Sequence, residues 1–505
     1  MIIMSRKLKI TVSIENENGE SIIEKISEKE IPYLEEFDKQ DFRTSFNQLE
    51  RAILDGRKEV SDDAIKEYLE EISKKKIIQE NDKTPESIIS ESHHLYCIES
   101  EVGSVKVVTH TLTDGTGRIL YSIANDYFEK KNPMQRFEST CMEELSLQLA
   151  SVLSYRPEAN LLNRIRQQSE GVKTTTLRNT IENQGKAINK ELHKKAEEIL
   201  LASGFTSNGD KVDGTEVAEI KPKTMDENKV QEAATELKLR NEVKVSDYEE
   251  EEQTVNISAD DVIVDRQATK RPNSKEKGKR KYASNTVIHV EKDKDAYIIN
   301  EGNIKSALKL LMGFLLTNCL IGQYQYVFFT DGATDINEPI KAMFGFVSYK
   351  IILDWYHLVK KVKERLSMGM NGYKLRNAFL DLILPILWKG DVAGAIALLE
   401  NLSDGQVKSR EEIIKLIDYL KRNEEYIPCY IMRSKLGLRN SSNCVENANS
   451  RVVSYRQKAR GMSWSKEGST GLATVSAATL NGELVNWTQN RTLKFSFNCD
   501  DEIAA

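Results

Sequence analysis

An aspartate that follows a run of apolar and aromatic residues is the first candidate for chemistry in this sequence. The stretch YVFFTDGATDI, residues 326–336, has the aromatic and β-branched content of a buried strand, and Gly332 marks a sharp turn after it. Asp331 is therefore expected at the carboxyl end of a strand, where open α/β sheets place their functional side chains. The alternative is an ordinary turn aspartate that bonds to the backbone following it.

A basic segment, residues 433–466, is the second candidate. Its basic residues outnumber its acidic ones, which is expected of a surface that binds the phosphate backbone of nucleic acid. Glu446 lies in this segment, and its ordinary alternative is a surface salt bridge. Asn443 and Asn447 flank it, and Ser441 is placed to cap its helix. Trp464 is expected either to stack on a base or to pack against a sheet.

A pair of helices is the third candidate. In EANLLNRIRQQSEGVKTTTLRNTIENQGKAI, residues 158–188, one helix breaks at Gly171 and a second begins after a threonine cluster whose hydroxyls can cap it. This is the outline of a helix-turn-helix, and the alternative is a plain helical hairpin. The residues placed to meet phosphates or base edges are Lys173, Thr175, Arg178 and Asn179.

Composition limits the classes of protein that fit. The 505 residues predict roughly three domains, and 39% hydrophobic with 30% charged residues is typical of a soluble chain. No apolar run reaches the roughly 18 residues of a membrane span, and no signal-peptide pattern is recognised at the start, so we expect a cytoplasmic, nucleoid-associated protein. The six cysteines lack CxxC pairs, and neither they nor His93 and His94 near Cys97 have zinc-site spacing.

The net charge of −6 is concentrated in one segment. Acidic residues outnumber basic ones in residues 206–256, aromatic residues are few and no strong periodicity is present, so an acidic disordered linker is predicted there. Before it we expect a mixed α/β region over residues 1–135, and then the mainly helical DNA-binding region with the helix-turn-helix over residues 136–205.

After the linker the pattern changes to strands. Three strands with turns suited to antiparallel pairing are expected within residues 256–300, followed by an amphipathic helix over 304–319, the strand that ends at Asp331, a helix, a strand and a helix. This succession is that of the ribonuclease H-like fold, an α/β (α+β) class. The long interval between Asp331 and Glu446 contains further helical patterns, which predict a helical insertion over 361–429 within a catalytic domain formed by 257–360 and 430–495.

Four stretches together resemble the DDE transposases of bacterial insertion sequences, closest to the ISLre-type and ISKra-type groups, whose relatives include Mutator-like elements. They are ISADDVIVDRQ, FFTDGATDI, IILDWYHLVKKV and SSNCVENANSRVVSYRQKARGMSWSKEG. Such families have an acidic first strand followed shortly by Gln, an Asp-Gly strand end, an Asp-x-x-His element, and a Glu-bearing helix that leads into Arg-x-Lys and Gly-Met-x-Trp. The resemblance covers about half of the chain.

The resemblance implies which residues carry the chemistry. Asp331 corresponds to the second catalytic carboxylate and Glu446 to the third. Asp260, Asp261 and Asp265 compete for the first, and the spacing to Gln267 favours Asp260, with Asp261 next as a metal ligand. Asp354 and His357 match the Asp-x-x-His element and have a supporting role, or they are a helix N-cap and a packed histidine.

The function implied is metal-dependent cleavage and strand transfer of DNA. Carboxylates suit Mg²⁺ or Mn²⁺, and two such ions can activate the attacking oxygen and stabilise the leaving one. The expected partners are terminal inverted repeats and target DNA, with a dimer or higher oligomer joining two ends. The alternatives are an inactive or domesticated DNA-binding descendant, and a helix-turn-helix regulator. The expected DNA contacts near Glu446 are Arg451, Arg456, Lys458, Arg460 and Trp464.

Overall fold

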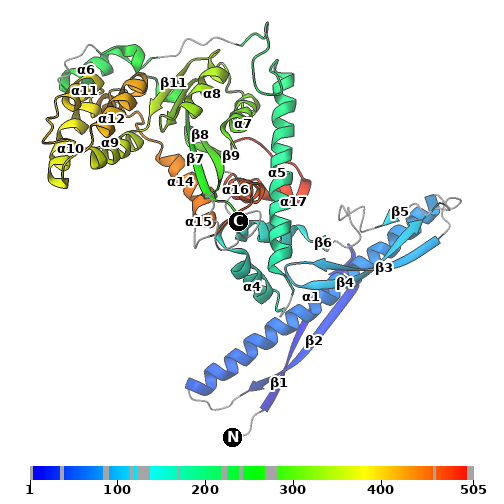
Figure 1. Cartoon of the computed structure of the whole chain (residues 1–505). Helices are drawn as coiled ribbons and strands as arrows, with labels where there is room; N and C mark the ends of the chain where they lie inside the picture. Colours follow the sequence, from blue (N-terminus) through cyan, green and yellow to red (C-terminus); the bar gives the residue numbers. More distant parts are fainter. Residues whose placement is uncertain are drawn as a thin grey trace, which may run out of the picture. The chain divides into compact units, whose positions relative to one another are not determined.

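The structure is a computed structural model, and the chain is a mixed helix and sheet protein (Figure 1). The structure describes residues 4–33, 39–83, 90–113, 116, 119–122, 137–168, 171–217, 224–237, 243–267, 281–458 and 462–497. The chain divides into two compact units, residues 1–180 and 181–505, and the boundary falls within helix α5 (Thr174–Ala202). Each unit is described by itself.

Unit 1 begins with a two-stranded antiparallel ribbon and a long helix that packs on it (Figure 1). A four-stranded sheet of order β5-β4-β3-β6 follows. The elements are β1 (Met4–Glu15), β2 (Ser21–Tyr33), α1 (Lys39–Lys83), β3 (Ser90–Glu99), β4 (Ser104–Thr113), β5 (Ile119–Ser122) and β6 (Phe137–Glu138). These elements include both helix and strands, and β6 of the same sheet lies beyond residue 135, the predicted end of this region.

The predicted helical pair is α4 (Tyr155–Ile165) and α5, preceded by α3 (Thr140–Val152). Residues 166–173 separate α4 from α5, which is longer than the 3–4 residues of a typical helix-turn-helix turn. Asn163 closes this connection, since its side chain both accepts from Val172 N (2.7 Å) and donates to Val172 O (3.1 Å). The two helices are present, but their connection is not the short turn of the predicted motif.

The prediction of a disordered linker over residues 206–256 needs correction. Within it lie α6 (Glu227–Leu237) and two short 3₁₀ turns, and Val230 and Tyr248 are buried in a cluster with Met432. Glu249 is also buried and forms a bidentate ion pair with Arg433 (2.6 and 3.0 Å). The acidic composition hid these apolar anchors, because each is isolated in the sequence and packs against a distant segment.

Unit 2 is built on one five-stranded sheet of order β11-β10-β7-β8-β9. β7, β8 and β9 pair antiparallel, whereas β10 pairs parallel to both β7 and β11. The strands are β7 (Thr254–Asp265), β8 (Tyr282–Lys292), β9 (Asp295–Glu301), β10 (Gln325–Thr330) and β11 (Tyr349–Leu353). The succession of strands and helices predicted from the sequence is confirmed.

The two faces of this sheet bury different helices. On one face α7 (Ile304–Thr317), α8 (Thr334–Phe344) and the second part of α5 pack on a core that includes Ile257, Ala259 and Phe328. On the other face α9 (Trp355–Gly369) packs with Val327 and Phe329. Because side chains alternate along a strand, this division fixes the face on which each strand residue lies.

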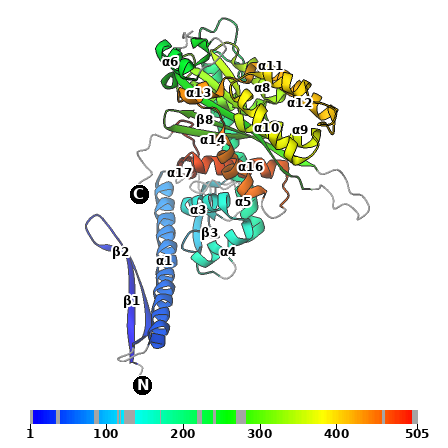
Figure 2. The ribbon, with the colours of Figure 1, turned by 90° about the vertical axis from the view of Figure 1, so that its left-hand side faces the viewer.

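The residues predicted as a helical insertion form a group of helices that continues the α9 layer (Figure 2). The chain then returns to the sheet through α14, which packs on β7 and β8. The helices after α9 that belong to this layer are α10 (Tyr373–Trp388), α11 (Val392–Glu400), α12 (Arg410–Arg422) and α13 (Tyr430–Lys435). The helical segments that follow them are α14 (Asn443–Asn449), a π-helical segment (Ser450–Ser454), α15 (Tyr455–Gln457), α16 (Lys466–Leu480) and α17 (Leu484–Asn490). None of the helices in the described ranges is both long and apolar enough to cross a membrane.

Candidate active site beside the end of a parallel strand

Asp331 lies where the sequence predicts it, directly after β10. Its Oδ1 accepts a hydrogen bond from Ala333 N (2.8 Å), so it also forms the turn expected of the ordinary alternative. Gly332 has φ +80°, and a Cβ there would lie 2.7 Å from Asn423 Oδ1 and 2.8 Å from Leu353 Cδ1. Glycine is therefore required by both the backbone and the packing, which explains the Asp-Gly pair.

Asp260 lies beside Asp331. Ser258 pairs with Phe329 in the parallel register of β7 and β10, and continuing that register by two residues brings Asp260 next to Asp331. Ala259 belongs to the core on the α7 face, so Asp260 is on the opposite face, where Asn449 of α14 donates to its Oδ2 (2.7 Å). Burial raises the pKa of Asp260; the charge of His357 opposes this increase, and the charge of Asp331 adds to it.

The structure separates Asp260 from Asp261. Asp261 shares the face of Ala259, and its Oδ1 accepts a hydrogen bond from the Thr286 hydroxyl across the strand pair. Burial is the main cause that raises its pKa. Asp265, the third competitor, is exposed at the far end of β7. Of the three, Asp260 is the one on the face that carries α14.

Asp354 connects the first turns of two helices. It is the N-cap of α9, where its Oδ1 accepts from His357 N (3.0 Å), and its Oδ2 accepts from both the backbone N and the hydroxyl (2.7 Å) of Ser442. Ser442 is the N-cap of α14, not the predicted Ser441. The buried carboxylate of Asp354 thus fixes the starts of α9 and α14 relative to each other, which confirms the N-cap alternative; a supporting role in catalysis stays a prediction.

Glu446 lies on α14 and faces His357, with 3.6 Å between Glu446 Oε1 and His357 Nε2. The three predicted carboxylates do not close into a metal-binding cluster. Within the described residues, the group of three metal-ligating side chains whose ligand atoms lie within 4.8 Å of one another is His289, Glu291 and Cys444.

The predicted DNA contacts divide into exposed and buried residues. Lys173, Thr175, Arg178 and Asn179 are exposed at the start of α5, and Arg451 and Lys458 are exposed after α14. Arg456 and Trp464 are instead buried: the guanidinium of Arg456 lies 5.3 Å from the Trp464 ring, and the indole N–H donates to Gln457 O (3.1 Å). Neither side chain is placed to meet DNA, which corrects that prediction, and Arg460 lies outside the described residues.

Other basic residues of the segment 433–466 already have acidic partners. Arg433 pairs with buried Glu249, Lys435 with Glu236 (2.6 Å), and Arg439 with Glu291. Sequence reasoning missed these pairs because the partners are distant in the chain. It also missed Asn449, which is three residues after Glu446 and therefore on a neighbouring part of the same helix face.

The fold and the site together define a mixed helix and sheet protein in which Asp260, within β7, lies beside Asp331, which directly follows the neighbouring parallel strand β10. Residues 183–492 match the model of the uncharacterised protein family UPF0236. This match covers more than half of the chain, and the chain therefore belongs to that family.

Other comparisons add little to this assignment. The comparison with curated proteins finds no match. Among solved structures the chain is similar to the Drosophila P element transposase strand transfer complex, with 12% identity over 74% of this chain and 85% of that chain and a TM-score of 0.23. With so low a TM-score, this likeness carries no conclusion about function.

Proposed function

We propose that the chain is a DDE-type transposase that cleaves and transfers DNA strands of an insertion sequence with divalent metal ions. The observation that carries the proposal is the proximity of Asp260 and Asp331: the parallel register of β7 and β10, continued by two residues, brings them together, and the charge of Asp331 adds to the rise in the pKa of Asp260 that burial causes. Glu446 lies beside His357, on helix α14, which packs against β7 and β8. Carboxylates arranged in this way suit phosphoryl transfer.

The strand order supports a ribonuclease H-like catalytic unit in residues 181–505. Three antiparallel strands are followed by two parallel ones, and the first strand occupies the centre of the sheet. In such a sheet the first and fourth strands are neighbours, so Asp260 within β7 lies beside Asp331, which follows β10. A helix after the insertion then supplies a third acid from a distant part of the sequence.

The donor set fits Mg²⁺ or Mn²⁺, and we expect two ions. Asp260, Asp331 and Glu446 offer only oxygen ligands, which these hard cations prefer. Asn449 Oδ1 is buried beside Asp260, and no hydrogen-bond partner for it is found in the part of the chain that the structure describes. Glu446 is 39% exposed, so its side chain is free to turn toward the aspartates. Bound ions supply activation of the attacking oxygen and stabilisation of the leaving oxygen.

The remaining residues of the site position these acids. Asn449 orients the Asp260 carboxylate, and Asp354 fixes the start of the helix that carries Glu446. His357 lies between the acids: its Nε2 is 3.6 Å from Glu446 Oε1, and its charge opposes the rise in the pKa of Asp260 that burial causes. Exposed Lys173, Arg178, Arg451 and Lys458 are the residues proposed to contact the DNA backbone.

The test is cleavage of DNA that carries the terminal inverted repeats, with Mg²⁺ or Mn²⁺, by the variants Asp260→Asn, Asp331→Asn and Glu446→Gln. Each substitution removes a metal-binding oxygen, and we expect cleavage to fall by more than about 100-fold with DNA binding retained. Gel shift and strand nicking measure the two activities separately.

Asp261→Asn is the matched control, because it makes the same chemical change one residue away on the other face of β7. We expect it to keep near wild-type cleavage. Equal loss in Asp260→Asn and Asp261→Asn would contradict the assignment of Asp260. A wild-type protein that shifts the DNA and never nicks it would instead support the inactive descendant or the regulator.

A further inference from the structure

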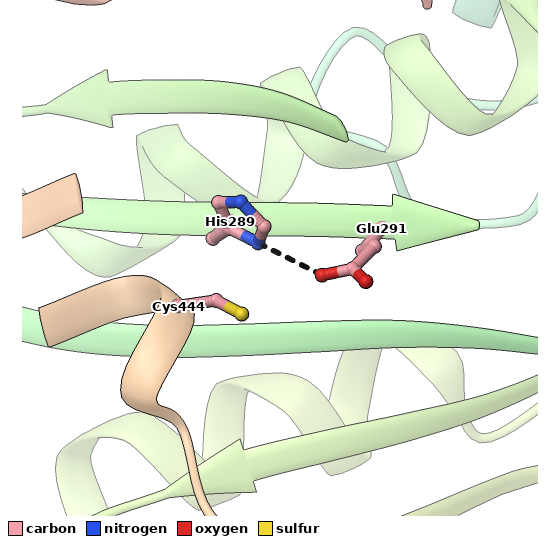
Figure 3. A group of neighbouring side chains, drawn as sticks. All are labelled: His289, Glu291 and Cys444. Atoms are coloured by element: carbon pink, nitrogen blue, oxygen red, sulfur yellow. Dashed lines mark ion pairs between the residues drawn. The ribbon is translucent and has the colours of Figure 1, made fainter. Parts of the chain in front are cut away.

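Figure 3 shows a cluster of three metal-ligating side chains, His289, Glu291 and Cys444. His289 pairs with Ser258 of β7, which is on the same face of the sheet as Asp260. His289 and Glu291 are two residues apart on β8 and therefore share a face, and Cys444 lies in the first turn of α14, which packs on β8. The ligand atoms of the three residues lie within 4.8 Å of one another, and His289 Nδ1 is 3.9 Å from Glu291 Oε2. All three residues are half-buried.

We propose that His289, Glu291 and Cys444 bind one zinc-type divalent cation. A thiolate, an imidazole and a carboxylate are the ligand types that Zn²⁺ accepts, and three protein ligands leave a fourth position open. Tetrahedral zinc with bonds of about 2.0–2.3 Å places its ligands roughly 3.3–3.8 Å apart. The observed separations therefore require only small side-chain movements. Mg²⁺ avoids thiolate and imidazole, so this site differs in metal preference from the oxygen-only carboxylate site.

Arg439 occupies the other side of the cluster. Its Nη2 pairs with Glu291 Oε1, and its Nη1 lies 3.5 Å from Cys444 Sγ. Because Arg439 holds Oε1, the second oxygen of Glu291 is the one that faces His289. Arg439 can therefore stay beside Glu291 and orient it when an ion binds on the His289 side, as second ligand shells do in metal sites.

The position of Cys444 indicates what the ion would do. Cys444 precedes Glu446 by two residues on the short helix α14. An ion shared by Cys444 and β8 would fix the first turn of this helix to the sheet, in addition to the hydrogen bonds from Ser442 to Asp354. This ordering role rests on the proposed function of Glu446, whereas binding of the ion does not.

Cobalt provides the test, because Co²⁺ replaces zinc and reports its ligands by absorption. The full-length protein, freed of metal with a chelator, is titrated with Co²⁺ in the presence of excess Mg²⁺. We expect one equivalent to give a thiolate-to-cobalt charge-transfer band, which Zn²⁺ abolishes and Mg²⁺ does not. The band should be absent in Cys444→Ser, and His289→Ala should lower the affinity for Co²⁺ at least about 10-fold. Cys429→Ser alters another half-buried cysteine of the same unit and should retain the band.

The outcomes separate this site from the proposed function. Two results would contradict the proposed metal site: the absence of a charge-transfer band in the wild-type protein, or a band that persists in Cys444→Ser. The wild-type titration decides the question even if a variant does not fold. Circular dichroism checks the fold of each variant. The measurement uses no DNA, so a protein that binds cobalt through Cys444 without cleaving DNA supports this site and contradicts only the proposed function.

Discussion

At the residue scale, the carboxylate of Asp354 joins two helices that are distant in the sequence. It accepts hydrogen bonds from His357 N at the start of α9 and from Ser442 at the start of α14, and it is buried. A buried acceptor that serves several donors is costly to remove, because the donors are left without partners.

Asp354→Ala is expected to lower the free energy of unfolding by roughly 2–4 kcal/mol, since it removes a helix cap and leaves the buried Ser442 donors unpaired. Denaturant unfolding measures the loss. Asp391→Ala is the matched control: Asp391 is the exposed N-cap of α11 and accepts from Gly394 N (2.8 Å). We expect a loss of only about 1 kcal/mol there. Similar losses in the two variants would mean that the connection to α14 contributes little.

Single residues also show how far the sequence could predict the site. The apolar run before Asp331 and the Gly after it predict the strand end, and this position is confirmed. The choice between Asp260 and Asp261 depends on the face of β7, which becomes visible only when the partners Asn449 and Thr286 are known. Arg456 and Trp464 have the composition of a DNA-binding surface, but burial is a tertiary property that local composition does not contain.

At the element scale, α5 approaches α16 so closely that their backbones touch. A Cβ on Gly185 would lie 2.0 Å from the backbone oxygen of Gly471. Farther along α5, Ala196 lies against Gly313 of α7, where an added Cβ would be 2.7 Å from the Ala196 Cβ. Small residues therefore set the packing distance of α5 in unit 2.

Gly185→Ala is expected to destabilise the protein by about 3 kcal/mol, near the upper part of the range for overpacking, because the clash is with backbone. The change should appear as a lower midpoint in denaturant unfolding. Gly405→Ala makes the same substitution at a position where a Cβ meets nothing within 4 Å and φ is not positive. It should change stability by less than about 1 kcal/mol, and an equal effect at both positions would show that the close approach is relieved by movement.

The elements themselves were largely predictable in unit 2, because strands and helices there have strong periodicity and apolar content. The structure of segment 206–256 was not predictable, because the apolar residues that anchor it in the core, such as Val230 and Tyr248, are few and are separated by acidic residues. Only contacts such as Glu249 with Arg433 reveal that it packs. Likewise, the length of the connection between α4 and α5 depends on how Asn163 closes it.

At the scale of the whole molecule, the net charge of −6 makes nucleic-acid binding depend on local positive charge. Lys173 and Arg178 are exposed within one turn of the start of α5. The double variant Lys173→Glu, Arg178→Glu is expected to weaken DNA binding at least about 10-fold. The slope of log K against log salt concentration should become less steep by about 0.9 for each phosphate contact that is lost. Fluorescence anisotropy at several salt concentrations measures both quantities.

Lys190→Glu is the control for the change in net charge, because Lys190 is exposed on the same helix, in unit 2. We expect its effect on affinity to be small and its salt dependence to stay close to that of the wild-type protein. If Lys190→Glu weakened binding as much as a single reversal at Lys173 or Arg178, overall charge would explain the effect and the start of α5 would have no special role.

The insertion between β11 and α14 has a consequence for synthesis on the ribosome. β7 and β10 emerge first, and the helices α10 to α13 are made before Ser442 and Asn449 can reach Asp354 and Asp260. A nascent chain, or a product of premature termination before residue 440, therefore presents Asp260 and Asp354 without α14, which supplies their partners Asn449 and Ser442. Translation past residue 449 is required before the proposed site can assemble.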